Sequence, residues 1–168
     1  DVKQTLDLWK GAVNSNFKLN GTPVEVQTVC HPEADMLAAV VRSAAHPAVN
    51  FRFPYPTGGH CDDACKWDAN DRHSTTIVSQ DGQQVVLKRT LDATTYYVTI
   101  RWEGKALFGE KDKNSFVLTP EEDTLAFTCA FTPEGASTET ATAVQTEQKA
   151  AEYWTAFWKN GAAVDFSA

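Results

Sequence analysis

Apolar and polar side chains alternate in short runs along the first 131 residues, and turn residues separate the runs. Nine runs predict β-strands, at residues 12–19, 22–30, 36–42, 48–53, 74–79, 83–89, 94–102, 116–118 and 125–131. Asn20-Gly21 and Asp81-Gly82 lie between neighbouring runs and favour tight hairpin turns. Because turns and not helical segments separate the strands, the sequence predicts a mainly β fold, an antiparallel two-sheet β-sandwich.

The pattern changes after Pro133, so we divide the chain into a sandwich (residues 1–133) and a linker followed by an amphipathic, aromatic-rich helix (134–168). Thr142 and Gln145 have the spacing of a helix capping box, and Gly161 suits the C-terminal cap. One face of this helix is expected to carry Val144, Ala151, Trp154 and Trp158.

Composition narrows the classes of function. The chain has 168 residues and a formal net charge of −7, with no basic cluster, which argues against nucleic acid or an anionic membrane as a partner. No apolar run approaches the ~20 residues of a transmembrane helix. The chain lacks an initiator Met, and we expect a processed product or a part of a longer chain.

No familiar cofactor or catalytic motif is present. The sequence has no phosphate-binding glycine loop, no dinucleotide fingerprint, no zinc-protease motif and no nucleophile elbow, so no cofactor is predicted. His31 and His46 precede prolines at strand ends, where we expect a structural role in capping backbone carbonyl groups.

Four cysteines, an even number, favour an exported, disulfide-bonded protein, and they allow three pairings. Cys61 and Cys65 lie close enough in sequence to close a small loop, which leaves Cys30 to pair with Cys129. The alternative is a zinc site, for which a single C-x3-C pair is weak support, with the ligands Cys61, Cys65, His60 and His73. We favour the disulfides, and no metal is predicted.

The irregular segment 54–72 is the candidate site, because long loops in compact domains are often functional. An indole ring beside carboxylates suits a sugar, whose apolar face stacks on the ring while its hydroxyls bind the oxygens. The predicted ligand-binding residues are Trp67, Asp68, Asp62, Asp63 and His73. Three alternatives stay open: a solvated acidic loop, a calcium site, and a paired-carboxylate hydrolase with Asp63 or Asp68 as the acid.

Four stretches of the sequence are informative together: Leu8-Trp9-Lys10-Gly11, Val26-Gln27-Thr28 with His31-Pro32 and Asp35, Arg52-Phe53-Pro54-Tyr55, and Phe157-Trp158 with residues 161–167. These stretches resemble secreted, fungal six-hairpin glycosidase-like proteins. The resemblance spans nearly the whole chain. It implies an N-terminal β-sandwich of the supersandwich kind, joined by a linker helix to a C-terminal (α/α)6 domain that hydrolyses glycosides and degrades polysaccharides.

In such proteins the catalytic acid and base belong to the helical domain, so the resemblance assigns no catalytic residue to this chain. The sandwich then has a supporting role and contacts glycan through the candidate loop. A cluster of aromatic residues would form the joint between the two domains, and these are Trp9, Tyr153, Trp154, Phe157 and Trp158. The alternatives are a free-standing lectin-like module and a small glycosidase or lyase that uses loop carboxylates.

Overall fold

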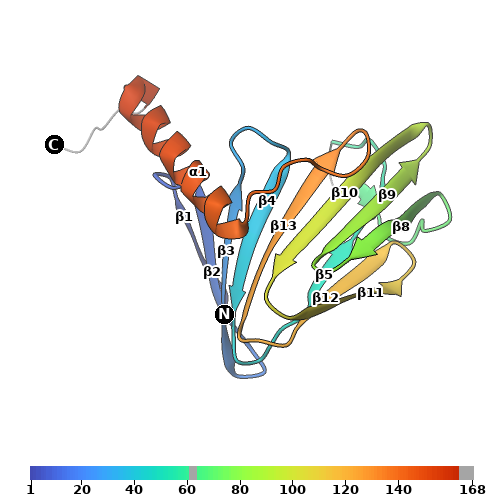
Figure 1. The fold of residues 1–168 in the computed structure, drawn as a ribbon, viewed down its shortest axis with the longest axis horizontal. Helices are drawn as coiled ribbons and strands as arrows, with labels where there is room; N and C mark the ends of the chain where they lie inside the picture. Colours follow the sequence, from blue (N-terminus) through green and yellow to red (C-terminus); the bar gives the residue numbers. More distant parts are fainter. Residues whose placement is uncertain (61–63, 163–168) are drawn as a thin grey trace.

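The computed structural model describes residues 1–60 and 64–162, and it consists of antiparallel β-sheets with one long helix (Figure 1). The strands are β1 (Lys3–Asp7), β2 (Ala12–Leu19), β3 (Thr22–Cys30), β4 (Met36–Arg42), β5 (Val49–Arg52), β6 (Tyr55–Pro56), β7 (Cys65–Lys66), β8 (His73–Asp81), β9 (Gln84–Leu91), β10 (Thr94–Glu103), β11 (Ala106–Asp112), β12 (Ser115–Pro120) and β13 (Thr124–Thr132). Helix α1 (Ala143–Phe157) is followed by a π-helical turn, η1 (Trp158–Ala162).

Eight strands form a large sheet in the order β1-β2-β3-β4-β13-β10-β9-β8, and three form a smaller sheet, β11-β12-β5. A third ladder joins only β6 and β7. Every pairing is antiparallel, so the predicted mainly β, antiparallel architecture is confirmed. Each predicted run overlaps a strand, and Asn20 and Gly21 both have positive φ, as a type I′ hairpin turn requires.

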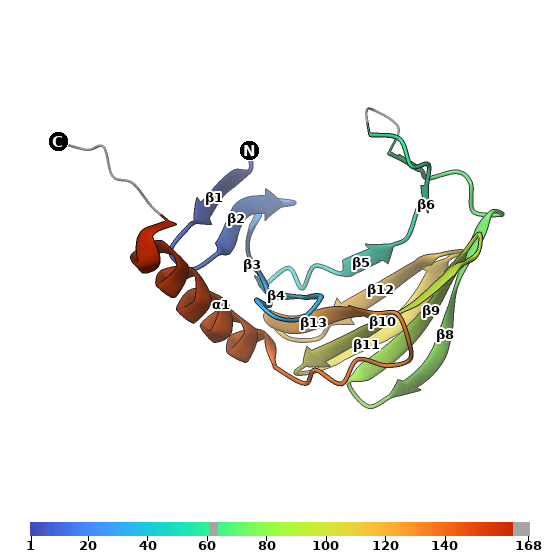
Figure 2. The same cartoon turned by 90° about the horizontal axis from the view of Figure 1, so that it is seen from above.

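The two faces of the large sheet are covered by different elements, as Figure 2 shows from above. Along β4, Ala39 and Val41 belong to the core between the sheets, whereas Ala38 and Val40 belong to a second core under helix α1. This strand is therefore apolar at almost every position and not at every second one. The main core is closed by the fully buried Phe116 and Leu118 of the smaller sheet.

Helix α1 docks on the outer face of the large sheet through small residues. Its buried side chains are Ala143, Thr146 and Ala150, which let the helix approach a sheet surface lined by alanine and valine. The predicted apolar face is wrong in one respect, because Val144 is 62% exposed. The reason is that a close approach to the sheet selects small side chains rather than the most hydrophobic ones.

The ends of α1 follow the sequence signals. The Thr142 side chain accepts a hydrogen bond from the Gln145 backbone N–H, and the Gln145 side chain accepts one from Thr142, so the capping box is present. Gly161 has φ +91°, a left-handed conformation that ends the helical run. The capping-box prediction is confirmed, whereas the C-cap of α1 is Trp158 and Gly161 lies in the turn that follows.

The predicted Cys30–Cys129 disulfide is wrong, because both residues are free cysteines. Strand β4 lies between β3 and β13, and Cys30 and Cys129 both pair in register with its Leu37. Residues two strands apart are separated by about 9–10 Å, beyond the ~7 Å that a disulfide spans. Cys65 is also a free cysteine, which speaks against the predicted Cys61–Cys65 disulfide, and Cys61 itself lies outside the described residues.

Replacing Gly11 by alanine tests the docking of the helix. Gly11 has φ +62°, and a Cβ atom built there overlaps the Trp154 indole. We expect Gly11→Ala to lower the free energy of unfolding by about 2–4 kcal/mol, from backbone strain plus overpacking. Gly82→Ala is the matched control, because Gly82 also has positive φ, at +53°, but nothing lies near its Cβ position. Its cost should be about 1 kcal/mol. Equal losses in a urea titration of the two variants would contradict this packing.

The free thiols make a second prediction. Cys30 is exposed, whereas burial raises the pKa of the Cys129 thiol to about 12. Since the thiolate is the reactive form, a thiol reagent should modify Cys30 in the native chain and Cys129 only after unfolding. Peptide mapping by mass spectrometry measures both sites. If both residues are protected until a reductant is added, the two cysteines form the disulfide after all, and the free thiols are contradicted.

Candidate functional site

A pocket of about 410 Å³ lies at one end of the smaller sheet, beside the irregular loop. It is formed by β5, the β11–β12 hairpin and the residues that follow β7. The lining residues are Asn50, Arg52, Phe53, Trp67, Asn70, Lys111, Asp112, Lys113, Asn114 and Ser115. Its volume falls in the range of small-molecule sites, about 300–1,000 Å³.

Strand β5 divides its side chains between the core and the pocket. Val49 and Phe51 are half-buried and pack against the main core, whereas Asn50 and Arg52 are exposed and line the pocket. This alternation follows from the strand period of two residues. Asn50 and Arg52 therefore face the pocket because the residues that alternate with them, Val49 and Phe51, pack against the core.

Asn114 connects the hairpin turn to the loop. It has φ +58°, a left-handed conformation that asparagine tolerates better than most residues. Its backbone oxygen accepts a hydrogen bond from Phe53 N at 3.0 Å, and its Nδ2 donates to Asn70 Oδ1 at 3.3 Å. Asn114 is only 3% exposed, and within the described part of the chain its Oδ1 has no hydrogen-bond partner. The most deeply buried lining residue therefore holds an unused acceptor.

Trp67 borders the pocket with 51% of its surface exposed. The Arg52 guanidinium carbon lies 4.5 Å from the centre of its ring, a cation–π contact that holds the indole beside β5. Lys111 Nζ donates to Asn50 Oδ1 at 3.1 Å, so the hairpin and β5 are also joined across the pocket wall.

A buried arginine fastens the start of the loop to the large sheet. Arg89 is 2% exposed, and its partners are all neutral. Its guanidinium donates to Tyr96 Oη, His73 Nδ1, Thr75 Oγ1 and the Pro54 carbonyl oxygen. Because His73 accepts this bond, its ring is neutral, and burial together with Arg89 lowers its pKa. These bonds tie three strands to Pro54, the residue at which the loop begins.

The end of the loop, at Arg72, is held by a hydrogen bond to Tyr55, near the start of the loop. The Tyr55 hydroxyl donates to the Asp92 carboxylate, 2.9 Å from Oδ2, and accepts from Arg72 Nη2 at 2.7 Å. The Arg72 guanidinium also lies 4.0 Å from the centre of the Tyr55 ring. Both ends of the loop are therefore held against the sheet, and the position of Trp67 between them is restricted.

The structure separates the predicted ligand-binding residues. Trp67 lines the pocket, whereas Asp68 is exposed and is not one of the lining residues. His73 is buried among structural partners. Asp62 and Asp63 lie outside the described residues, so their predicted roles are untested.

Sequence reasoning missed most of the polar lining, namely Asn50, Arg52, Asn70, Lys111, Lys113 and Asn114. Strand β11 was not predicted, because its charged residues and Gly109 obscure the alternation of apolar and polar side chains. Lys113-Asn114, a pair of turn residues before the apolar run 116–118, marks the hairpin that sequence inspection could have found.

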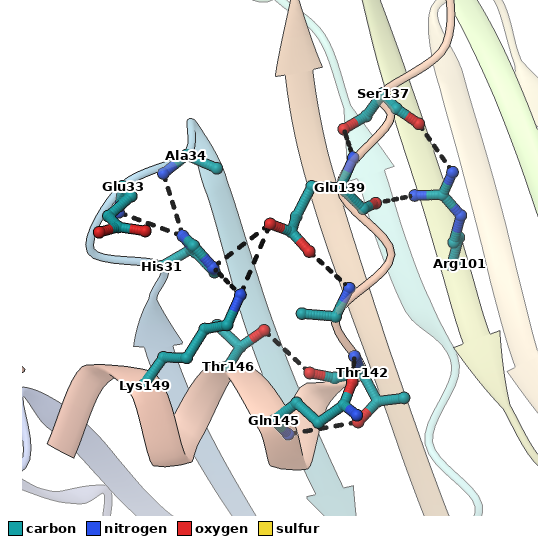
Figure 3. Close-up of polar contacts among 11 residues, drawn as sticks. His31, Glu33, Ala34, Arg101, Ser137, Glu139, Thr142, Gln145, Thr146 and Lys149 are labelled. Atoms are coloured by element: carbon teal, nitrogen blue, oxygen red, sulfur yellow. Dashed lines mark hydrogen bonds and ion pairs between the residues drawn. The ribbon is translucent and has the colours of Figure 1, made fainter. Parts of the chain in front are cut away.

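The linker before α1 is clamped to the outer face of the large sheet, as Figure 3 shows. Arg101 of β10 donates to the carbonyl oxygens of Ser137 (2.8 Å) and Glu139. Thr99 Oγ1 accepts from Ser137 N at 2.9 Å, and the Glu103 carboxylate accepts from the first helical N–H, that of Ala143. The helix therefore starts from a fixed point on the sheet.

A second set of contacts joins the linker, the helix and the β3–β4 turn (Figure 3). His31 Nδ1 accepts from the backbone N–H groups of Glu33 and Ala34, so this histidine caps amides and not the expected carbonyls. Its Nε2 lies 3.6 Å from Glu139 Oε2 and 3.0 Å from Lys149 Nζ. A backbone hydrogen bond from Ala141, with a smaller contribution from the Lys149 cation, holds the pKa of Glu139 below its usual value.

His46 likewise caps no carbonyl group, because its Nε2 lies 2.7 Å from Asp123 Oδ1. This contact joins the segment after β4 to the start of β13. The structural role expected of His46 is kept through a different partner.

The far end of α1 carries an exposed apolar surface, which we call the aromatic patch: Leu8, Trp9, Tyr153 and Phe157. Their exposed fractions are 55%, 53%, 47% and 42%. Trp9 lies on the turn after β1 and not on the predicted strand. Hydrogen bonds from Thr155 Oγ1 to Trp9 O and from Trp158 Nε1 to Leu8 O bring the turn and the helix together.

Two predicted joint residues lie deeper. Trp154 and Trp158 are half-buried, with ring centres 6.2 Å apart, and Trp154 packs against the core under the helix. Phe157 contacts both indoles edge to face, at 5.4 and 5.0 Å. The patch is thus a rigid surface built on packed rings, and large exposed apolar surfaces of this kind usually mark an interaction site.

Comparison with solved structures gives a fold-level relationship. The chain is similar to a structure described as "Putative kojibiose phosphorylase from human microbiome", with a TM-score of 0.59 and 9% identity, over 95% of this chain and 25% of that one. The chain therefore spans about a quarter of the length of that protein. No protein-family model matches the sequence, and no curated protein does. At 9% identity the likeness supports the β-sandwich fold alone, so the carbohydrate-active role and the fungal and secreted origins stay predictions.

Two other kinds of site are absent from residues 1–60 and 64–162. These residues contain no cluster of three or more His, Cys, Asp or Glu side chains that could hold a metal ion. They also contain no helix with the length and hydrophobicity of a transmembrane segment.

The linker contacts predict a pH effect. Because the pKa of Glu139 is lowered in the folded chain, its stabilisation is complete above the ordinary value of 4.5 and is lost as the pH falls through the folded value. Glu139→Gln should lower the free energy of unfolding by up to about 1 kcal/mol at pH 7 and by less at pH 3. The control is Glu134→Gln, on an exposed turn residue. If Glu139→Gln lowers the free energy of unfolding equally at both pH values, the ionised carboxylate contributes nothing to stability and the prediction is contradicted.

Proposed function

We propose that this chain is the non-catalytic β-sandwich of a secreted carbohydrate-active enzyme, and that a helical catalytic domain packs against its aromatic patch. The observation that carries this proposal is the fold, which matches about a quarter of a structure described as "Putative kojibiose phosphorylase from human microbiome". The catalytic groups then lie on polypeptide outside these residues, and the sandwich supports them.

The aromatic patch supports this arrangement. Its four residues are about half exposed although they sit on a surface fixed by hydrogen bonds and stacked rings. Burying apolar surface favours association by about 25 cal/mol per Å². Aromatic residues are common anchors of such contacts. A domain that continues from the end of the helix would meet this surface first.

The pocket favours binding over catalysis. Asp112 is the only carboxylate among its described lining residues, whereas glycoside hydrolysis needs two opposed carboxyl groups. A small glycosidase built on this pocket is therefore not supported. The second candidate function is a carbohydrate-binding module, which is favoured by the exposed indole beside three amide side chains.

The aromatic patch can be tested in the protein that includes the coding sequence beyond Ala168. The double variant Tyr153→Ser/Phe157→Ser should reduce saccharide turnover at least about fivefold and lower the Tm by several degrees, because it removes apolar contact at the joint. In the 168-residue chain the same variant should lower the Tm by less than in the longer protein, since both side chains are already about half in water there.

Val144→Ser is the control, because Val144 is exposed on the same helix and does not belong to the patch. It should behave like the unmodified protein in both contexts. The proposal fails if the double variant has the same small effect in both, or if the reading frame ends at Ala168. Turnover of saccharide by the 168-residue chain alone would also contradict it.

A further inference from the structure

We propose that the pocket beside Trp67 binds an anionic saccharide, with a uronic acid unit as the ligand class. This inference rests on the proposed carbohydrate-related function and names the ligand of its glycan contact. It begins with the local charge. Among the described lining residues, Arg52, Lys111 and Lys113 are cationic and only Asp112 is anionic, although the whole chain has a net charge of −7. The sign of the charge is thus reversed at the pocket.

The hydrogen-bonding groups left open in the pocket are mainly donors. Asn50 and Asn70 each use the Oδ1 atom within the protein, which leaves their amide N–H groups for a ligand. The side chains of Arg52 and Lys113 make no hydrogen bond to another described residue. One carboxylate oxygen of Asp112 is occupied by the Lys113 backbone N–H at 2.7 Å. A surplus of open donors selects a ligand rich in acceptors, and a carboxylate is the strongest of these.

The apolar part of the pocket points to a sugar and not to a bare anion. Trp67 lines the pocket and is 51% exposed, and Phe53 also contributes to the lining. The C–H face of a pyranose packs on an aromatic ring, whereas inorganic anions gain nothing from it. A volume of about 410 Å³ also suits a saccharide better than a single small ion.

Asn114 leaves one acceptor unsatisfied beside the pocket. Its Oδ1 is buried, with almost no accessible area, and has no partner within residues 1–60 and 64–162. The carboxylate and the ring face of a uronic acid are therefore matched by the cations with the amide N–H groups and by Trp67, and not by Asn114.

The test is calorimetric titration of the 168-residue chain with oligosaccharides of galacturonate, glucuronate and mannuronate, each paired with its methyl ester. The ester keeps the sugar ring and removes the charge. We expect at least one acid to bind at least about tenfold more tightly than its ester, and more weakly as salt rises from 0.05 to 0.5 M. Inorganic phosphate and acetate are the probes for a simple anion site.

Variants locate the binding. Lys113→Met should weaken it at least about fivefold, and Trp67→Ala should weaken both acid and ester. Lys66→Met is the matched control, because Lys66 is an exposed cation of the same loop that does not line the pocket, and it should change affinity less than about twofold.

The inference is overturned if no acid binds, if acids and esters bind equally, if phosphate or acetate binds as tightly as the sugar acids, or if Lys113→Met binds like the unmodified chain. None of these results touches the aromatic patch, whose double variant tests the supporting role separately. Failure of one proposal is therefore distinguishable from failure of the other.

Discussion

The fold depends on burying both faces of the central strands of the large sheet. Strand β4 places Ala39 and Val41 on one face and Ala38 and Val40 on the other, so each face needs its own cover. The smaller sheet covers one face and helix α1 the other (Figure 2). This one constraint places both candidate surfaces, because the smaller sheet carries the pocket and the helix carries the aromatic patch.

Each surface is then fixed by hydrogen bonds to the sheet. Arg89 and Tyr55 hold the ends of the irregular loop, so Trp67 is presented beside Arg52 without a disulfide between the described cysteines. Arg101 and the capping box fix the start of the helix, which sets the place of its aromatic end. Rigid presentation lowers the entropy lost on binding, which suits surfaces meant for a ligand and for a second domain.

Local signals in the sequence predicted the local structure well. The strand runs, the Asn20-Gly21 turn and the ends of α1 follow from side-chain period, turn chemistry and capping, which act over a few residues. The Cys30–Cys129 pairing failed because strand order is a long-range property, and Leu37 of β4 lies between the two cysteines. Most of the pocket was missed for the same reason: Asn50 and Lys111 are 61 positions apart and meet only in the sheet.

The central claim is that the aromatic patch is the contact surface for a catalytic domain. Hydroxyl-radical footprinting, compared between the 168-residue chain and the protein extended beyond Ala168, tests it directly. The account predicts that Trp9, Tyr153 and Phe157 are labelled in the short chain and protected in the longer protein, while Val144 is labelled equally in both. Equal labelling of the patch in the two proteins would contradict it.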